Sequence, residues 1–304
     1  MKRLLILSGK GGTGKTTTAA AFIRFADAKA VADCDVDAPN LHIVDRGASS
    51  FEESDFLGGD KARVNPSLCV GCGLCAMRCR FHALRLVGGV CAVDERACEG
   101  CGVCAYACMR DAIDLVPDVA GTKRLAIEED AESRRVFSTA MLKMGRGNSG
   151  KLVTEVKRAM DGHAQGSDLA IIDGSPGIGC PVIASMNGVD LVLVVAEPSL
   201  SGMSDLTRLV ETAKPFGVKL VVCVNKWDSS PAHAEEIERY CADAGIPFAG
   251  RIPYDKSASA AVNAGMSVAD LDCPARDALR NVYARVMGLL FEGGRAATDV
   301  ASQV

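Results

Sequence analysis

The residues best suited to chemistry are cysteines that repeat at one spacing. Eight of the 14 cysteines form two runs of identical pattern: Cys69, Cys72, Cys75 and Cys79, then Cys98, Cys101, Cys104 and Cys108. A C-x2-C-x2-C loop wraps three thiolates around one corner of an iron-sulfur cluster, and a more distant cysteine closes the far side. Structural zinc and disulfides also use cysteines, but the doubled spacing favours two cluster sites.

A glycine-rich motif lies near the start of the chain. Residues 9–16 read Gly-Lys-Gly-Gly-Thr-Gly-Lys-Thr and stand between an apolar run and a helical pattern. In such a loop backbone N–H groups converge on phosphate oxygens, Lys15 neutralises their charge, the Thr16 hydroxyl ligates Mg²⁺, and the helix start adds a positive dipole end. We expect a bound nucleotide to contact Gly11, Gly12, Thr13, Gly14, Lys15, Thr16 and Thr17.

Apolar runs alternate with helical patterns along most of the chain. The apolar runs predict strands over residues 3–8, 30–33, 169–172, 191–196 and 219–224. Helical patterns cover residues 16–28, 152–160, 205–212 and 234–244. This alternation predicts an α/β fold, a P-loop parallel sheet with helices on both faces.

The cysteine block interrupts this alternation. Residues 61–116 hold short segments and no long helical pattern, which predicts a small inserted α+β domain. Its two halves share their cysteine spacing, and Gly71 and Gly73 recur as Gly100 and Gly102. An internal duplication is the simplest explanation.

The insertion divides the rest of the chain. We expect the nucleotide domain to consist of residues 1–60 and 117–304. Within it, residues 45–60 and 117–150 are interpreted as connectors, and the charged run 128–135 as the solvated face of a helix.

Length and charge limit the class of protein. A chain of 304 residues suits one large domain with an addition. A formal net charge of -4 gives no basic footprint for nucleic acid, and no apolar run approaches the roughly 20 residues that a membrane span needs. The short apolar stretch 4–7 runs into the glycine-rich loop, where a signal peptide would need a cleavage site. We therefore expect a cytoplasmic protein with no nucleic-acid partner and no membrane span.

The cysteine block resembles bacterial two-cluster ferredoxins over its whole length. In those proteins the fourth cysteine of each run ligates the other cluster, which implies two crossed [4Fe-4S] sites here. Cluster one takes Cys69, Cys72, Cys75 and Cys108, and cluster two takes Cys98, Cys101, Cys104 and Cys79. The proline expected after each fourth cysteine is replaced by Arg80 and Met109. The charge of Arg80 near cluster two is expected to raise its reduction potential.

A second lysine, Lys10, makes the phosphate loop resemble the deviant loop of the superfamily of MinD, ParA, Mrp and the nitrogenase iron protein. A solvated lysine is the plain alternative. The resemblance implies a nucleotide-sandwich dimer, either a homodimer or a pair with a related ATPase, in which Lys10 reaches the other subunit's nucleotide. It also implies that residues 33–41 form switch I, with Asp35 positioning the attacking water and Asp33 as second candidate. Asp173 would hold the Mg²⁺ shell and Gly177 would move in switch II.

The residues expected to contact the base leave two alternatives for the nucleotide, GTP and ATP. Asn225-Lys226-Trp227-Asp228 resembles the guanine-reading motif of GTPases, whereas deviant-loop ATPases place an asparagine at the same strand end to meet adenine. The motif context favours ATP. We expect Asn225, Pro253 and Asp255 to line the base pocket.

The six remaining cysteines are scattered, and most are expected to be small buried hydrophobes. Cys180 follows Asp173 by seven residues, as a cluster-ligating cysteine does in the nitrogenase iron protein. A buried free cysteine under switch II is the favoured interpretation, because the other ligating cysteine of that protein has no counterpart here.

Nearly the entire chain resembles MinD-like ATPases that contain an inserted ferredoxin domain. This resemblance implies an ATPase that couples nucleotide state to electron transfer from two clusters to a redox partner. A scaffold or carrier that delivers clusters to an apo-metalloprotein is the alternative. MinD-like spatial positioning is a third hypothesis, but residues 278–291 carry few basic side chains and are expected to pack on the core.

Overall fold

The computed structural model describes residues 1–45, 50–129 and 134–291. Its strands are β1 (Lys2–Leu7), β2 (Ala30–Asp33), β3 (Glu52–Val64), β4 (Leu84–Val87), β5 (Val90–Val93), β6 (Ile113–Glu129), β7 (Arg134–Leu142), β8 (Leu169–Asp173), β9 (Leu191–Ala196), β10 (Lys219–Asn225) and β11 (Phe248–Ile252). Its α-helices are α1 (Lys15–Ala26), α2 (Leu41–Val44), α3 (Leu74–Arg78), α4 (Val103–Tyr106), α5 (Ser149–His163), α6 (Cys180–Met186), α7 (Leu200–Ala213), α8 (Pro231–Asp243), α9 (Lys256–Asn263) and α10 (Pro274–Phe291). Short 3₁₀ helices are η1 (Lys214–Phe216), η2 (Trp227–Ser229) and η3 (Val268–Asp270).

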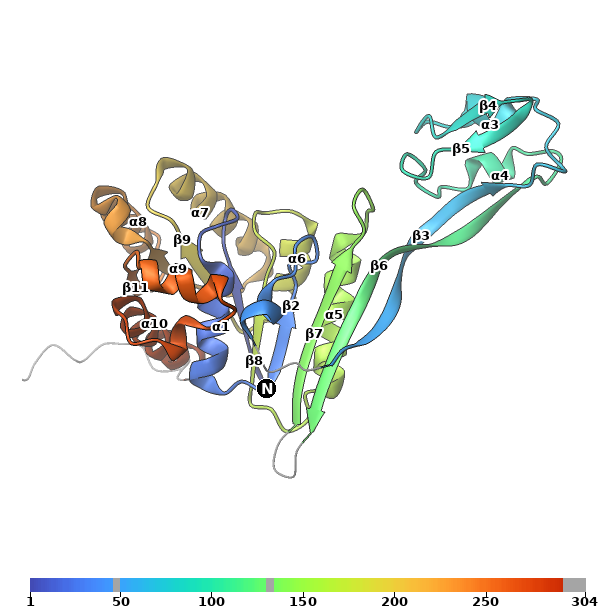
Figure 1. Ribbon diagram of the computed structural model, residues 1–304. Coiled ribbons are helices and arrows are strands. Elements are labelled where there is room, and N and C mark those ends of the chain that lie inside the picture. Colours follow the sequence, from blue (N-terminus) through green and yellow to red (C-terminus); the bar gives the residue numbers. More distant parts are fainter. Residues whose placement is uncertain (46–49, 130–133, 292–304) are drawn as a thin grey trace, which may run out of the picture.

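One large sheet carries the nucleotide half of the protein. Its nine strands lie in the order β11-β10-β9-β1-β8-β2-β7-β6-β3 (Figure 1). The strands from β11 to β7 are all parallel, which confirms the predicted P-loop sheet, whereas β6 and β3 add an antiparallel edge. Parallel strands need crossover connections, and the helices supply them.

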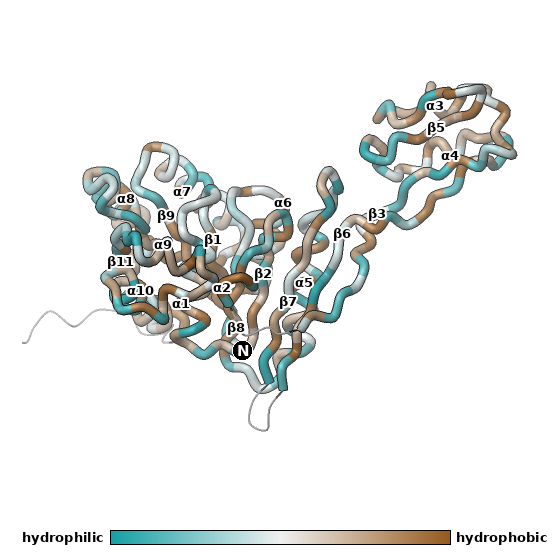
Figure 2. Tube along the Cα trace, viewed as in Figure 1, coloured by the Kyte–Doolittle hydropathy of each residue, from teal (hydrophilic) through white to brown (hydrophobic). Residues whose placement is uncertain are grey.

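Helices cover both faces of the sheet, as the sequence predicts. Strand side chains of alternating parity point to opposite faces, so Leu5 and Leu7 pack beneath α5 to α8, and Leu4 and Ile6 beneath α1 and α10. Figure 2 shows hydrophobic residues along the central strands and more hydrophilic ones on the outer helices. Helix α10 buries Leu279, Val282, Val286 and Leu290, so the expectation that this helix packs on the core is confirmed. Among the described residues no helix is long and apolar enough to cross a membrane.

The predicted connectors are wrong, because the segments on both sides of the insertion are long strands. β3 and β6 form one antiparallel ribbon, which starts on the main sheet beside β7 and runs out to the cysteine domain (Figure 1). The glycine pair Gly58-Gly59 is typical of a linker, yet it forms an irregularity within the ribbon. A side chain at Gly58 would lie 2.5 Å from the Ala120 Cβ, so the close approach of the two strands requires glycine there.

The charged run 128–135 is not a helix face. Glu128 and Glu129 end β6, and Arg134 and Arg135 begin β7. The middle of the run, residues 130–133, lies outside the described residues. Arg135 pairs with the buried Asp45, so its charge ties β7 to the segment after α2.

The cysteine domain has an internal twofold pattern with an offset of 29 residues, the distance from Cys69 to Cys98. The hairpin β4–β5 pairs Leu86 with Cys91, and the outer end of the ribbon pairs Leu115 with Ala62 in the equivalent positions. The last residues of the ribbon are therefore also the second hairpin of the cysteine domain. The predicted boundaries at 60/61 and 116/117 fall inside continuous strands rather than in loops.

Candidate functional site

The carboxyl ends of the parallel strands meet at one edge of the sheet, and the candidate nucleotide residues follow them. The phosphate loop follows β1, Asp33 ends β2, Asp173 ends β8 and Asn225 ends β10. In open α/β sheets this edge is where ligands bind. The loop turns into α1 through Gly14, whose φ of 95° favours glycine and whose Cβ would lie 2.2 Å from the Asn225 amide nitrogen.

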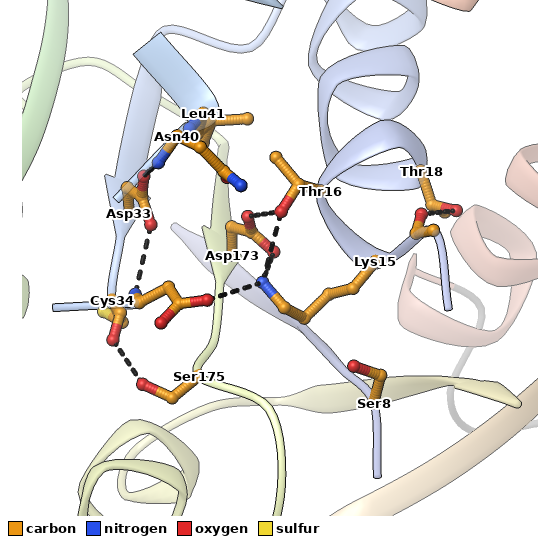
Figure 3. A network of polar contacts seen from close by, with 12 residues as sticks. Ser8, Lys15, Thr16, Thr18, Asp33, Cys34, Asn40, Leu41, Asp173 and Ser175 are labelled. Atoms are coloured by element: carbon orange, nitrogen blue, oxygen red, sulfur yellow. Dashed lines mark hydrogen bonds and ion pairs between the residues drawn. The ribbon is translucent and has the colours of Figure 1, made fainter. Parts of the chain in front are cut away.

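A buried carboxylate joins the two main residues of the phosphate loop. The Lys15 ammonium lies 2.7 Å from Asp173 Oδ1, and the Thr16 hydroxyl donates to Asp173 Oδ2 over 2.7 Å (Figure 3). Burial acts to lower the pKa of Lys15, but the carboxylates of Asp173, Asp35 and Asp33 together outweigh it and raise the pKa above its ordinary value. The three residues predicted to hold phosphate and Mg²⁺ thus form one contact network.

The two switch I candidates have different surroundings. Asp33 is fully buried, and its carboxylate accepts hydrogen bonds from the backbone N–H groups of Asp35, Asn40 and Leu41 (Figure 3). Burial and then the neighbouring Asp173 raise the pKa of Asp33 to about 7. Asp33 therefore holds the loop in shape and has no free face toward a substrate.

Asp35 instead opens onto the cleft. Its carboxylate lies 3.9 Å from the Lys15 ammonium and lines a cleft of about 910 Å³, together with the phosphate loop and Ser175. Burial raises the pKa of Asp35 to about 6, although Lys15 acts in the opposite direction. Of the two candidates, Asp35 is the one that can meet a water molecule above the phosphate loop.

A smaller pocket of about 240 Å³ adjoins the cleft at Gly12, Gly14 and Thr17. Its lining includes the predicted base residues Asn225, Pro253 and Asp255. The Asn225 amide donates to the Thr13 carbonyl over 2.7 Å, and so links the base pocket to the phosphate loop. The Asp255 carboxylate accepts from the Ser257 N–H and caps α9, which gives it a structural contact at the pocket wall.

Lys10 does not contact the other loop residues with its side chain. Its ammonium pairs with Glu197 Oε2 at 2.6 Å and donates to the Ser201 hydroxyl over 3.0 Å. The same Glu197 lies 3.9 Å from the Lys226 ammonium. Sequence reasoning did not identify Glu197 as a site residue, although its place after a buried strand was the available signal.

The segment predicted as switch II contacts Ser8, directly before the phosphate loop, and the segment predicted as switch I. The Ser175 hydroxyl donates to the Cys34 carbonyl over 2.7 Å (Figure 3), and the Gly177 N–H donates to the Ser8 carbonyl over 2.9 Å. Gly177 has a φ of 91°, a conformation that favours glycine. Ser175 was not among the predicted site residues.

Cys180 is exposed at the start of α6, so the expectation of a buried free cysteine is wrong at this position. The reason is that α6 begins at the surface, against the first turn of α5: a Cβ on Gly150 would lie 3.2 Å from the Cys180 carbonyl oxygen. The other five scattered cysteines are buried, as expected: Cys34, Cys91, Cys223, Cys241 and Cys273.

Six of the eight predicted cluster cysteines lie in or against the core of the cysteine domain, whereas Cys72 and Cys101 are exposed. One small cavity is lined by Cys79 from the first run and by Cys98, Cys101 and Cys104 from the second. Backbone N–H groups donate to four of the cysteine sulfurs over 3.4 Å: Ala62 to Cys98, Ala83 to Cys79, Cys91 to Cys69 and Ala112 to Cys108. No group of three or more His, Cys, Asp or Glu side chains in the described part of the chain is arranged to hold a metal ion.

Comparison with known proteins agrees with the nucleotide half of this geometry. An uncharacterized protein of Methanocaldococcus jannaschii is 32% identical over 234 residues, which are 74% of this chain and 78% of that protein. The cell division ATPase MinD of Pyrococcus furiosus has a similar fold, with a TM-score of 0.55 and 16% identity over 95% of this chain and 99% of its own. The septum site-determining protein MinD of Pyrococcus horikoshii, solved with Mg-ADP, has a TM-score of 0.56 and 15% identity. The match covers 97% of this chain and 99% of that protein.

The family comparison covers most of the sequence. Residues 4–268 match the CobQ/CobB/MinD/ParA nucleotide binding domain. This range contains the phosphate loop, the two predicted switch segments and the predicted base residues Asn225, Pro253 and Asp255, and it also spans the cysteine domain. The chain therefore belongs to the CobQ/CobB/MinD/ParA family of nucleotide-binding domains.

Proposed function

We propose that this protein binds and hydrolyses ATP with Mg²⁺, and that its nucleotide state controls electron transfer through two [4Fe-4S] clusters in residues 61–116 to a redox partner. One observation carries the proposal. A phosphate loop beside the buried carboxylates of Asp33 and Asp173, and a domain that carries two cysteine runs of identical spacing, are joined by one antiparallel ribbon of the same sheet.

The residues around the phosphate loop divide the work of hydrolysis. Lys15 neutralises the β- and γ-phosphates, and Asp35 orients a water molecule for in-line attack. Thr16 and Asp173 would hold Mg²⁺, which supplies charge neutralisation at the transferred phosphoryl group. Ser175 ties switch II to the carbonyl of Cys34 in switch I, so a change at either switch reaches the other.

The base pocket favours adenine. Asn225 keeps its side-chain amide on the Thr13 carbonyl, so its position is fixed by the phosphate loop. The Asp228 carboxylate, which a GTPase would use to pair with guanine, accepts instead from the Tyr254 N–H over 2.8 Å. An aspartate engaged with backbone has less capacity left for a base.

The cysteine arrangement suits clusters better than single ions. A lone zinc ion holds its thiolates about 2.3 Å from one point, whereas a cubane accepts one thiolate at each iron and needs them spread around its own volume. The cavity lined by three cysteines of one run and Cys79 of the other has the crossed composition of cluster two. Backbone N–H groups on four of the sulfurs would stabilise their negative charge.

A chain of contacts leads from switch II to the cysteine domain. The first turn of α5 lies close to Cys180, since a Cβ added at Gly150 would be 3.2 Å from the Cys180 carbonyl oxygen. Just before that turn, the Asn148 amide donates to the Gly58 carbonyl over 2.6 Å, and Arg146 contacts both Asp118 of the ribbon and Glu95 of the cysteine domain. A displacement of switch II by the γ-phosphate would reach the cysteine domain by this route.

A dimer would complete the ATP site. The Lys10 ammonium is partly exposed on Glu197, and release from that pair would let it reach a nucleotide bound to a second copy or to a related ATPase. ATP would draw the two subunits together, and hydrolysis would separate them.

The deciding measurement is anaerobic purification with iron and sulfide counted, followed by ATPase assays with the protein oxidised and reduced. We expect about eight irons per chain, since two clusters hold four each, and an ATPase rate that differs between the two redox states. Iron-free protein would contradict the cluster assignment. Identical rates, together with transfer of the clusters to an apo-protein, would instead favour the scaffold alternative.

Replacing Asp35 by Asn tests its role toward water. We expect kcat for ATP hydrolysis to fall by about 10²-fold or more, because a positioned base is lost, while ATP binding is retained, because fewer negative charges face the γ-phosphate. Asp37→Asn, an exposed carboxylate of the same cleft, is the matched control and should keep kcat within about twofold of wild type. Equal losses in both variants would assign the effect to net charge.

The raised pKa of Asp35 predicts a pH dependence of stability in the nucleotide-free chain. The folded chain binds this proton more tightly than the unfolded chain, in which the pKa of Asp is about 3.9. Its stabilising contribution is therefore complete below about pH 4 and is lost as the pH rises through about 6. In urea titrations with chelator, the free energy of unfolding should fall from about pH 4 to about pH 6, and should fall less in Asp35→Asn. If the unfolding free energies of wild type and Asp35→Asn depend on pH in the same way, Asp35 does not carry the raised pKa.

Replacing Arg146 by Gln tests the route between the two halves. In the wild-type chain we expect ATP to change, by about tenfold, the rate at which an external oxidant takes electrons from the reduced protein, since this is a typical size of coupling between two sites. In Arg146→Gln we expect this change to shrink to less than about twofold. Basal ATPase activity should remain. Arg124→Gln removes the ion pair with Glu53 within the ribbon and leaves the α5 contacts intact, so it should preserve the ATP effect.

A further inference from the structure

The twofold pattern of the cysteine domain makes one residue stand out. Residues separated by 29 positions make equivalent contacts: Ala83 and Ala112 donate to Cys79 and Cys108. The same rule relates Ala62 to Cys91, whose backbone N–H groups donate to Cys98 and Cys69 over 3.4 Å. An alanine and a cysteine thus donate the same backbone hydrogen bond to a cysteine sulfur in the two halves of the domain.

The thiol of Cys91 is therefore an addition to one half of the domain only. Its Sγ lies 3.3 Å from the Sγ of Cys75, within the hydrogen-bonding range of sulfur. Its side chain is buried, with 5% exposed. In the other half, Ala62 lines the cavity with Cys98 and Cys104 and brings no sulfur. Cluster one would accordingly have five thiols around it, and cluster two four.

We infer that Cys91 is a reserve ligand of cluster one, able to take the iron that Cys75 holds. This inference rests on the proposed cluster function. In the exchange the bond between Cys75 and iron would break and a bond from the Cys91 sulfur would form, while the proton of the Cys91 thiol would pass to Cys75. No electrons are transferred and no other reactant is needed. The 3.3 Å between the two sulfurs keeps the displacement small.

Burial explains why the exchange would be confined to this pair. Cys75 and Cys91 are both almost enclosed, whereas Cys72 is exposed and belongs to the same run. A buried thiol beside a ligand sulfur is protected from solvent oxidants and is always within reach of the iron that the ligand leaves.

The symmetry of the domain provides its own control. In the full-length chain, prepared without oxygen, Cys75→Ala should keep about eight irons because Cys91 replaces the lost ligand, whereas Cys104→Ala, at the equivalent position of cluster two, should keep about four. Cys75→Ala/Cys91→Ala should also fall to about four. Iron and sulfide counts and the electron paramagnetic resonance of the reduced protein report these states without any assay of activity.

A mirror variant guards against a simple folding failure. Ala62→Cys/Cys104→Ala places a thiol where cluster two lacks one, and it should recover the irons that Cys104→Ala loses. Equal iron loss in Cys75→Ala and Cys104→Ala, with no recovery in the mirror variant, would overturn the inference and leave the cluster assignment intact. Wild-type chain without iron would overturn both.

Discussion

Charge balance at the end of β8 governs the nucleotide half of this protein. Three carboxylates, Asp33, Asp35 and Asp173, face one ammonium, that of Lys15. All four groups are removed wholly or largely from water, and the pKa values of Asp33 and Asp35 are raised in consequence. Such a cluster is short of positive charge. A divalent cation arriving with a nucleotide would supply that charge, so the imbalance favours the bound state.

The second constraint is the continuity of the ribbon. A two-stranded ribbon is marginally stable on its own in water, but this one is anchored at both ends. At the base β6 pairs with β7 and Phe56 is buried in the main core, and at the tip the same strands form one hairpin of the cysteine domain. A motion of the base would therefore be transmitted along hydrogen-bonded backbone rather than through a flexible linker.

Elements and site residues could be predicted from the sequence wherever a contiguous motif carries them. The phosphate loop, Asp33, Asp173 and the strands that carry them follow from contiguous motifs, and the helices on both faces follow from periodicity. The ribbon could not be read in this way, because Gly58-Gly59 and Pro117 are typical of loops and many of the ribbon's side chains are exposed on both faces. Pairing between strands that are separated by a whole domain leaves no local signal.

Side-chain partners show the same limit. That Lys10 rests on Glu197, or that Ser175 bonds the Cys34 carbonyl, depends on how β1, β2, β8 and β9 are ordered in the sheet. The duplication of the cysteine domain is different, because its offset is visible in the sequence while its meaning is not. The strand register and the hydrogen bonds to sulfur show that Cys91 occupies the place of Ala62, and hence that its sulfur is not required by the fold. A buried side chain that the fold does not need, beside a residue that is proposed to hold a cluster, is where a further function is best sought.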